Sequence, residues 1–309
     1  MSAVFSIALP VFALILTGAF AGWRRLLGAD VTGAINMFVV WLALPAVLFQ
    51  AMAHIHLPDL LNFGLLASYG LAIVIPFILA LTWSRGTGTG VGGATMRAMA
   101  ATYSNVGYMG LPLCRIAFGD ASLVPSVIML VVTACPHFAM GVGLLEFDRP
   151  GRGGAWHAFR RVGGALIRNP LLISPALGLL VALSGAGLPV AVDRYLTLLG
   201  AAATPCALVA SGLMLIETTE RFQPRLVARL VCLKLLVQPA VAWILAFHVL
   251  TLPPVWGETA VIMSALPTGA GAFILAKLYN REVAATSGTV LVSTVLSFGT
   301  LSWLLSVLG

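Results

Sequence analysis

The sequence predicts an all-α polytopic membrane protein, in which ten transmembrane helices form two inverted five-helix repeats. Three observations predict this fold: an apolar composition, ten long apolar stretches, and helix-breaking residues at matching positions of the two halves. The 309 residues are 60% hydrophobic and 9% charged. Soluble domains have roughly 45–50% apolar and about 25% charged residues, so the bilayer must be the main solvent of this chain.

Apolar stretches of about 20 residues, the length of helix that crosses a bilayer core, follow one another with short connections. They leave no room for a sizeable soluble domain. The expected spans are Val4–Trp23, Thr32–Ala53, Leu60–Trp83, Met96–Phe118, Leu123–Leu145, Ile167–Leu188, Leu196–Ile216, Leu226–Leu250, Glu258–Tyr279 and Ala284–Leu308.

The basic residues between these spans are distributed unevenly. Of the 17 lysines and arginines, fourteen fall on one side of the membrane and only Arg115 and Arg194 on the other, with Lys234 inside a span. Positive residues mark the cytoplasmic side. We therefore expect a multi-pass protein of the cell inner (plasma) membrane with both termini outside the cytoplasm. The bias also accounts for the formal charge of +7 without a nucleic-acid partner.

The two halves, residues 1–145 and 165–309, each hold five spans and are joined by a short cytoplasmic loop, residues 146–164. An odd number of spans makes the second repeat enter the membrane from the opposite side. Helix-breaking residues recur in corresponding spans at separations of 160 to 165 residues: Pro10 and Pro175, Pro45 and Pro205, Pro76 and Pro239, Gly107 and Gly269.

The fourth and ninth spans contain helix breakers near their middle, which predicts that helices 4 and 9 are broken and cross. Unwound backbone at this depth is tolerated only where it is buried in protein or lines a cavity, so the matched pair predicts a binding site. The half-helix after each break offers unpaired amides and roughly half a positive charge, which suits a carboxylate. The alternative is that glycine and proline serve only close helix packing.

The chemistry of enzymes has little support in this sequence. All ten acidic residues lie at span ends or in loops, and no phosphate-binding loop, Ser/His/Asp set or HExxH motif occurs. We expect no cofactor and no resident metal, although His54, His56 and Asp59 form a short polar loop with weak metal-binding spacing.

Two motifs resemble the auxin efflux carrier family, which includes plant PIN-type carriers and bacterial permeases for malate, malonate and similar carboxylates. They are Ser104-Asn105-Val106-Gly107-Tyr108-Met109-Gly110-Leu111-Pro112 and Leu266-Pro267-Thr268-Gly269 with Ala272-Phe273. The resemblance covers essentially the whole chain. It implies an elevator-type transporter, often a homodimer, with spans one, two, six and seven as a scaffold and the other spans as a transport domain.

By this resemblance, the substrate carboxylate would be surrounded by residues of the two motifs, with Pro45 and Pro205 shaping the scaffold face. The motif residues are Ser104, Asn105, Gly107, Tyr108, Pro112, Pro267, Thr268 and Gly269.

Four further polar residues have open roles. Gln50 and Ser211 would contact substrate or bond between helices. His137 would take part in proton or substrate binding, or pack as a neutral imidazole. Lys234 would snorkel to the interface or act as a cation near the substrate path.

The sequence thus predicts a secondary transporter for a small organic anion, coupled to H⁺, to Na⁺ or to the membrane potential alone. A metabolite sensor and a sodium-coupled symporter of the bile-acid type are the alternatives. The short central loop argues against the sensor, and the lack of mid-membrane carboxylates argues against a cation antiporter.

Overall fold

A computed structural model describes residues 2–27, 30–55, 62–85, 88–148, 168–216 and 223–308, and these residues are helical apart from short connections. The first half contains α1 (Ser2–Trp23), α2 (Val31–Phe38), α3 (Leu44–Ala53), α5 (Phe63–Arg85), α6 (Gly90–Thr102), α7 (Leu111–Phe118), α8 (Leu123–Val132) and α9 (Phe138–Phe147). The second half contains α11 (Pro170–Ser184), α12 (Val190–Ala201), α13 (Ala203–Ile216), α14 (Pro224–Cys232), α15 (Gln238–Trp243), α16 (Pro254–Ala265), α17 (Ala270–Tyr279) and α18 (Val283–Leu308).

Several neighbouring helices are joined without a break by a π-helical turn, so that two or three elements form one long rod. Val39–Ala43 joins α2 to α3, Thr133–His137 joins α8 to α9, and Leu233–Val237 joins α14 to α15. Two further π-helical turns lie at one end of a helix: Val106–Gly110 precedes α7 and Ile244–Val249 follows α15, and a short 3₁₀ turn covers Asp120–Ser122. The expected all-α class is therefore confirmed for the part of the chain that the structure describes.

Six of these rods are long and apolar enough to cross a membrane. They are Val31–Ala53, Phe63–Ser84, Asp120–Phe147, Val190–Met214, Pro224–Val249 and Val283–Leu308. Four shorter apolar helical segments accompany them: Leu9–Trp23, Val106–Phe118, Pro170–Ser184 and Ala270–Tyr279. Most of the expected loop at residues 146–164, together with His56, Asp59, Glu217 and Glu220, lies outside the described residues.

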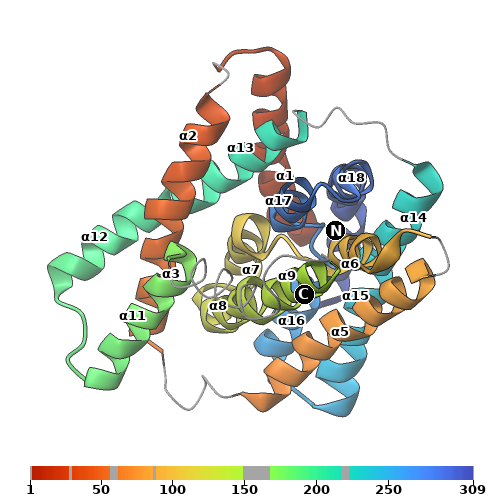
Figure 1. Cartoon of the computed structure of the whole chain (residues 1–309). Helices are drawn as coiled ribbons and strands as arrows, with labels where there is room; N and C mark the ends of the chain where they lie inside the picture. Colours follow the sequence, from red (N-terminus) through yellow and green to blue (C-terminus); the bar gives the residue numbers. More distant parts are fainter. Residues whose placement is uncertain are drawn as a thin grey trace.

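The helices gather in two groups, and the first contains α1 to α3 and α11 to α13 (Figure 1). In the first group, α1 packs along α13 and α3 packs along α11. The α1–α13 contact brings the two backbones together, because a Cβ atom on Gly18 would overlap the Val209 carbonyl and one on Gly212 would overlap the Ile15 carbonyl. Small residues at such contacts let membrane helices approach closely.

The second group contains α5 to α9 and α14 to α18, which lie in the centre and on the other side in Figure 1. Long helix α18 turns a row of small polar residues inward, where Thr286, Ser287, Thr289, Ser293 and Ser297 are all buried. Polar side chains inside a bundle surrounded by lipid bond to their own helix or face a cavity.

Charged contacts hold together the ends of α6, α9, α17 and α18 that lie on the expected cytoplasmic side. Arg97 Nη2 lies 3.0 Å from Glu282 Oε1, and Arg281 Nη2 lies 3.6 Å from Asp148 Oδ2. The Tyr279 hydroxyl donates to Glu146 Oε1 at 2.8 Å. These contacts engage the described carboxylates at this end of the second group.

Candidate functional site

The candidate site lies where two helix interruptions meet. Helix α6 ends at Thr102 and the chain is non-helical from Tyr103 to Asn105, while α16 ends at Ala265 and the chain is non-helical up to Gly269. The two segments form an antiparallel bridge between Ser104 and Thr268. The Asn105 N–H donates to the Pro267 carbonyl at 2.9 Å, and the Gly269 N–H donates to the Tyr103 carbonyl at 2.8 Å.

Glycine is required on the second segment because the segments are so close. A Cβ atom on Gly269 would lie 3.0 Å from the Ser104 carbonyl oxygen and 3.1 Å from the Asn105 Cα. A Cβ atom on Gly271 would lie 2.5 Å from the Tyr103 ring. Gly269 therefore has two roles: it interrupts the helix, and it lets the two backbone segments come into contact.

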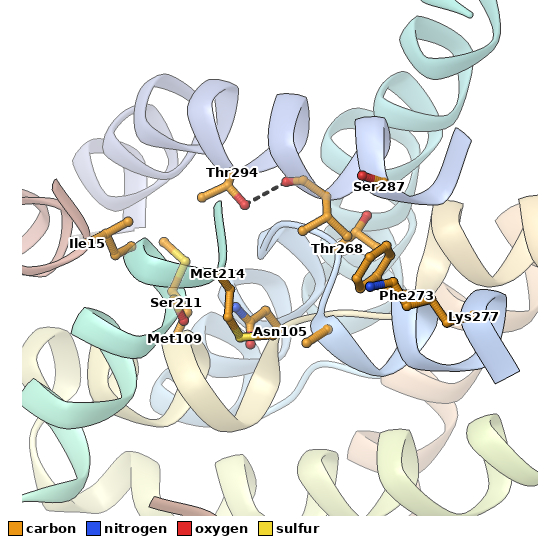
Figure 2. Close-up of a pocket in the computed structure, with 12 residues that line it drawn as sticks. Ile15, Asn105, Met109, Ser211, Met214, Thr268, Phe273, Lys277, Ser287 and Thr294 are labelled. Atoms are coloured by element: carbon orange, nitrogen blue, oxygen red, sulfur yellow. Dashed lines mark hydrogen bonds between the residues drawn. The ribbon is translucent and has the colours of Figure 1, made fainter. Parts of the chain in front are cut away.

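A cavity of about 90 Å³ opens beside the bridge (Figure 2). A single water needs roughly 10–15 Å³ of such space, so this cavity has room for a small organic molecule. Its wall combines Ile15 of α1 and Ser211 and Met214 of α13 with residues of the second helix group. The latter are Asn105, Met109, Thr268, Ala270, Phe273, Lys277, Ser287, Val290 and Thr294.

Several polar groups of this wall lack a protein partner among the described residues. The Asn105 side-chain amide and the Ser211 hydroxyl make no hydrogen bond there, and the Ser287 hydroxyl is unpaired in a side chain that is only 2% exposed. Two other hydroxyls are already engaged: Thr268 Oγ1 donates to the Ala100 carbonyl and Thr294 Oγ1 to the Val290 carbonyl, both at 2.7 Å. Buried polar groups normally have partners, so the buried unpaired Ser287 hydroxyl indicates a polar ligand, and the partly exposed Asn105 and Ser211 side chains can bind it from the same wall.

A buried lysine donates a hydrogen bond to one of the two residues of the bridge. Lys234, fully buried, donates to Ser104 Oγ at 2.9 Å, Gln238 Oε1 at 2.7 Å and the Ser264 carbonyl at 2.7 Å. The Gln238 amide nitrogen in turn donates to the Thr102 carbonyl at 3.2 Å. The snorkelling interpretation of Lys234 is therefore wrong, because its amine is fully buried and donates to three oxygen atoms inside the bundle.

The remaining motif residues lie around the bridge rather than in the cavity wall. Gly107 faces Leu44 and Leu130, and the Tyr108 hydroxyl donates to the Asn36 side chain. Pro112 is buried in the first turn of α7, and Pro267 is buried in the non-helical segment.

His137 lies behind the bridge and outside the cavity wall. Its Nε2 is 3.1 Å from Thr102 Oγ1, and its ring lies between those of Phe77 and Tyr103. Its Nδ1 has no partner among the described residues. This environment favours a packed imidazole over contact with a ligand in the cavity.

Gln50 lies in a different cavity, of about 450 Å³, together with His54 and Arg115. Its amide nitrogen donates to Asp193 Oδ1 at 2.8 Å and to Thr197 Oγ1 at 2.9 Å, and His54 Nε2 lies 2.9 Å from the same Asp193 oxygen. Gln50 therefore bonds between α3 and α12, while Ser211, its counterpart in the second half, faces the first cavity.

The paired prolines of the first helix group lie away from both polar cavities. Pro45 stands in the first turn of α3, on a surface groove shared with α11 and α12. Pro205 lies near the start of α13. Among the described residues there is no group of three or more His, Cys, Asp or Glu side chains that could hold a metal ion.

Sequence reasoning missed part of the cavity wall. Ser287, Val290 and Thr294 share one face of α18, at spacings of three and four residues that could have marked a polar stripe. In the sequence, Lys277 stands out only as one of the fourteen basic residues on the expected cytoplasmic side. Ile15, Met109 and Met214 are ordinary apolar residues, and no sequence signal distinguishes them from lipid-facing ones.

The part of the chain that the structure describes is helical, with several helices of membrane length and a polar cavity between helix groups, which indicates a multi-pass membrane protein. Residues 3–305 match the family described as "Membrane transport protein", and the chain belongs to this family, which is the auxin efflux carrier family. The expected family is thus confirmed.

Curated relatives cover nearly the whole chain. A protein of Rhizobium meliloti named "Putative malonate transporter" is 28% identical over 99% of this chain and 96% of its own length. A protein of Methanothermobacter thermautotrophicus named "Uncharacterized transporter" is 24% identical over 94% of this chain and 93% of its own. The "Uncharacterized transporter YfdV" of Escherichia coli K12 is 25% identical over 93% of this chain and 92% of its own.

Proposed function

We propose that this protein is a secondary transporter that moves a small organic anion with a carboxylate group across the cell inner (plasma) membrane. The observation that carries this proposal is the cavity beside the Ser104–Thr268 bridge, whose free polar groups are donors. The Asn105 amide, the Ser211 and Ser287 hydroxyls and the first N–H groups of α17 point to one anionic ligand. The name of the Rhizobium relative points to the same substrate class.

The proposed architecture has ten spans in two inverted repeats, with α6–α7 and α16–α17 as the broken helices 4 and 9. The pairing of helices supports it, because α1 packs on α13 and α11 packs on α3, which exchanges equivalent partners between the halves. The bridge supports it too, since its two hydrogen bonds are reciprocal: Asn105 to Pro267, and Gly269 to Tyr103.

We propose elevator-type alternating access for this architecture. The cavity wall is shared between the first helix group (Ile15, Ser211, Met214) and the second group, which carries the bridge. The cavity of Gln50, His54 and Arg115 is also shared between α3 and α12 on one side and α7 and α8 on the other. If the second group slides against the first, the substrate beside the bridge faces first one cavity and then the other. A homodimer through the first group completes the proposal, with the exposed apolar side chains of α12, such as Val190, Tyr195 and Leu198, as the contact surface.

Coupling to sodium is disfavoured by the surroundings of Lys234. Sodium needs several oxygen ligands, and the oxygen atoms that converge behind the bridge, Ser104 Oγ, Gln238 Oε1 and the Ser264 carbonyl, already accept from the Lys234 amine. An ammonium group has three donors, which these three acceptors match. We propose that the Lys234 amine occupies these three oxygen atoms in place of a cation and that transport does not require sodium.

The test is uptake of labelled malonate into proteoliposomes by the wild type and by two matched variants. Asn105→Asp places a negative charge in the cavity without changing side-chain size. Asn169→Asp makes the same change at the N-cap of α11, where Asn169 Oδ1 accepts from the Leu171 N–H at 3.0 Å and aspartate caps equally well.

We expect Asn105→Asp to lower the flux about tenfold or more, because it replaces a hydrogen bond to a charged group with repulsion. Asn169→Asp is expected to leave the flux unchanged. Equal flux in both variants would remove the cavity from the transport path, and a failure of the wild type to carry any carboxylate would overturn the proposed function.

A further inference from the structure

Among the residues that line the cavity beside the bridge, Lys277 is the one that carries a charge. The chain has only two lysines, Lys234 and Lys277. Lys277 lies in the last turn of α17, and its side chain runs back along the helix so that Nζ is 4.5 Å from the centroid of the Phe273 ring (Figure 2). A cation over an aromatic face at this distance is attracted by the ring. The ammonium group is thereby held at the cavity.

Neither a helix cap nor a carboxylate partner among the described residues accounts for the position of the Lys277 side chain. The end of α17 is capped by backbone groups, because the Asn280 N–H donates to the Lys277 carbonyl at 3.2 Å and the Arg281 N–H to the Ala276 carbonyl at 3.0 Å. The described carboxylates nearby are engaged elsewhere: Glu282 with Arg97, and Asp148 with Arg281. Among the described residues, Lys277 therefore faces the cavity without a carboxylate partner.

The volume of the cavity fits a short ligand. Lys277 and Ala270, the first residue of α17, line the same cavity of about 90 Å³. Two carboxyl carbons separated by one or two methylene groups lie about 2.5–4 Å apart, given ordinary C–C bond lengths. A dicarboxylate of this size is small enough for the cavity.

The unpaired Ser287 hydroxyl is a second, independent indication of the ligand. It is buried in the same wall and has no partner among the described residues. A further hydroxyl donor in this wall suits a ligand with several oxygen atoms.

We propose that Lys277 is a specificity-determining residue, which binds the second carboxylate of a short dicarboxylate while Asn105 and the start of α17 bind the first. This inference rests on the proposed transport of carboxylates and narrows it to dianions. Selection arises because a monoanion occupies only one of the two positive ends and leaves the ammonium without a partner.

The experiment compares malonate with malonamate, which has the same size but carries an amide in place of the second carboxylate. Uptake of both is measured in proteoliposomes with wild type, Lys277→Gln and Arg281→Gln. Arg281 is four residues further along, at the same end of the bundle, but does not line the cavity. Its variant therefore controls for the general loss of one positive charge.

We expect the wild type to favour malonate and Lys277→Gln to raise the KM for malonate about tenfold or more, the loss of a charge-assisted hydrogen bond. Malonamate uptake should be unchanged in Lys277→Gln, which also shows that the variant is folded. Arg281→Gln should behave as the wild type with both compounds.

Equal effects of Lys277→Gln on malonate and malonamate would overturn the role of Lys277 while leaving carboxylate transport standing. So would equal effects of the two variants on malonate. A wild type that carries neither compound would overturn the proposed function and this inference with it.

Discussion

The buried position of Lys234 allows a quantitative prediction with a matched control. Replacing Lys234 by methionine keeps an unbranched side chain up to the Cε position but removes the ammonium group. Three oxygen atoms then lose their donor: Ser104 Oγ, Gln238 Oε1 and the Ser264 carbonyl. Because leaving a buried polar group unsatisfied costs about 1–3 kcal/mol, the summed loss is at least about 3 kcal/mol. That is a large part of a typical stability of about 5–15 kcal/mol.

The control is the same substitution at the second lysine. Lys277 is exposed, and its ammonium lies over the Phe273 ring. Lys277→Met should therefore change the free energy of unfolding by no more than about 0.5 kcal/mol. The assay is thermal unfolding of the purified protein in detergent, where about 3 kcal/mol corresponds to a fall in Tm of roughly 6 °C or more.

Equal Tm values for the two methionine variants would refute this reasoning. A Lys234→Met variant as stable as the wild type would mean that the three oxygen atoms find other partners and that the buried charge brings no net stability. A more stable variant would show that desolvation of the ammonium outweighs its hydrogen bonds.

Two further predictions concern glycines. Gly269→Ala should reduce transport at least as strongly as Asn105→Asp, because the new methyl group would lie 3.0 Å from the Ser104 carbonyl and push the two segments apart. Flux in proteoliposomes measures this effect. The control is Gly299→Ala, where no atom lies within 4 Å of the added methyl group. Gly212→Ala should separate α13 from α1 and lower the free energy of unfolding by about 1–3 kcal/mol, the usual cost of overpacking. Gly143→Ala, whose added methyl group has no atom within 4 Å, should leave the stability unchanged. Unfolding in detergent measures both variants, and equal stabilities would contradict the close contact of α1 and α13.

Much of the fold follows from the sequence because hydrophobic length and helix breakers are local signals. The expected stretch Thr32–Ala53 corresponds to the rod Val31–Ala53, and Leu226–Leu250 corresponds to Pro224–Val249. The non-helical backbone at Tyr103–Asn105 and Leu266–Gly269 stands beside the glycines and prolines singled out in the sequence. Such residues act on their own backbone, so their effect needs no knowledge of neighbours.

The details of the site depend on neighbours that are distant in the sequence. Lys234 is long enough either to snorkel or to reach inward, and Ser104 and Ser264, which decide between the two, lie 130 and 30 residues away. Gln50 and Ser211 follow equivalent prolines, yet Gln50 bonds to Asp193 and Ser211 faces the cavity. Periodicity gives the face of a helix, but the rotation of that helix against its neighbours is set by packing.

The most direct test of the central claim is a current recording on a solid-supported membrane that carries proteoliposomes with the wild-type protein. Jumps in malonate concentration are applied with sodium, with potassium in its place, and with or without a proton gradient. An anion transporter whose bridge is held by Lys234 predicts saturable currents of equal size in sodium and potassium. Absence of any current, together with absence of tracer uptake, would contradict transport of this anion, and a current that requires sodium would contradict the role given to Lys234.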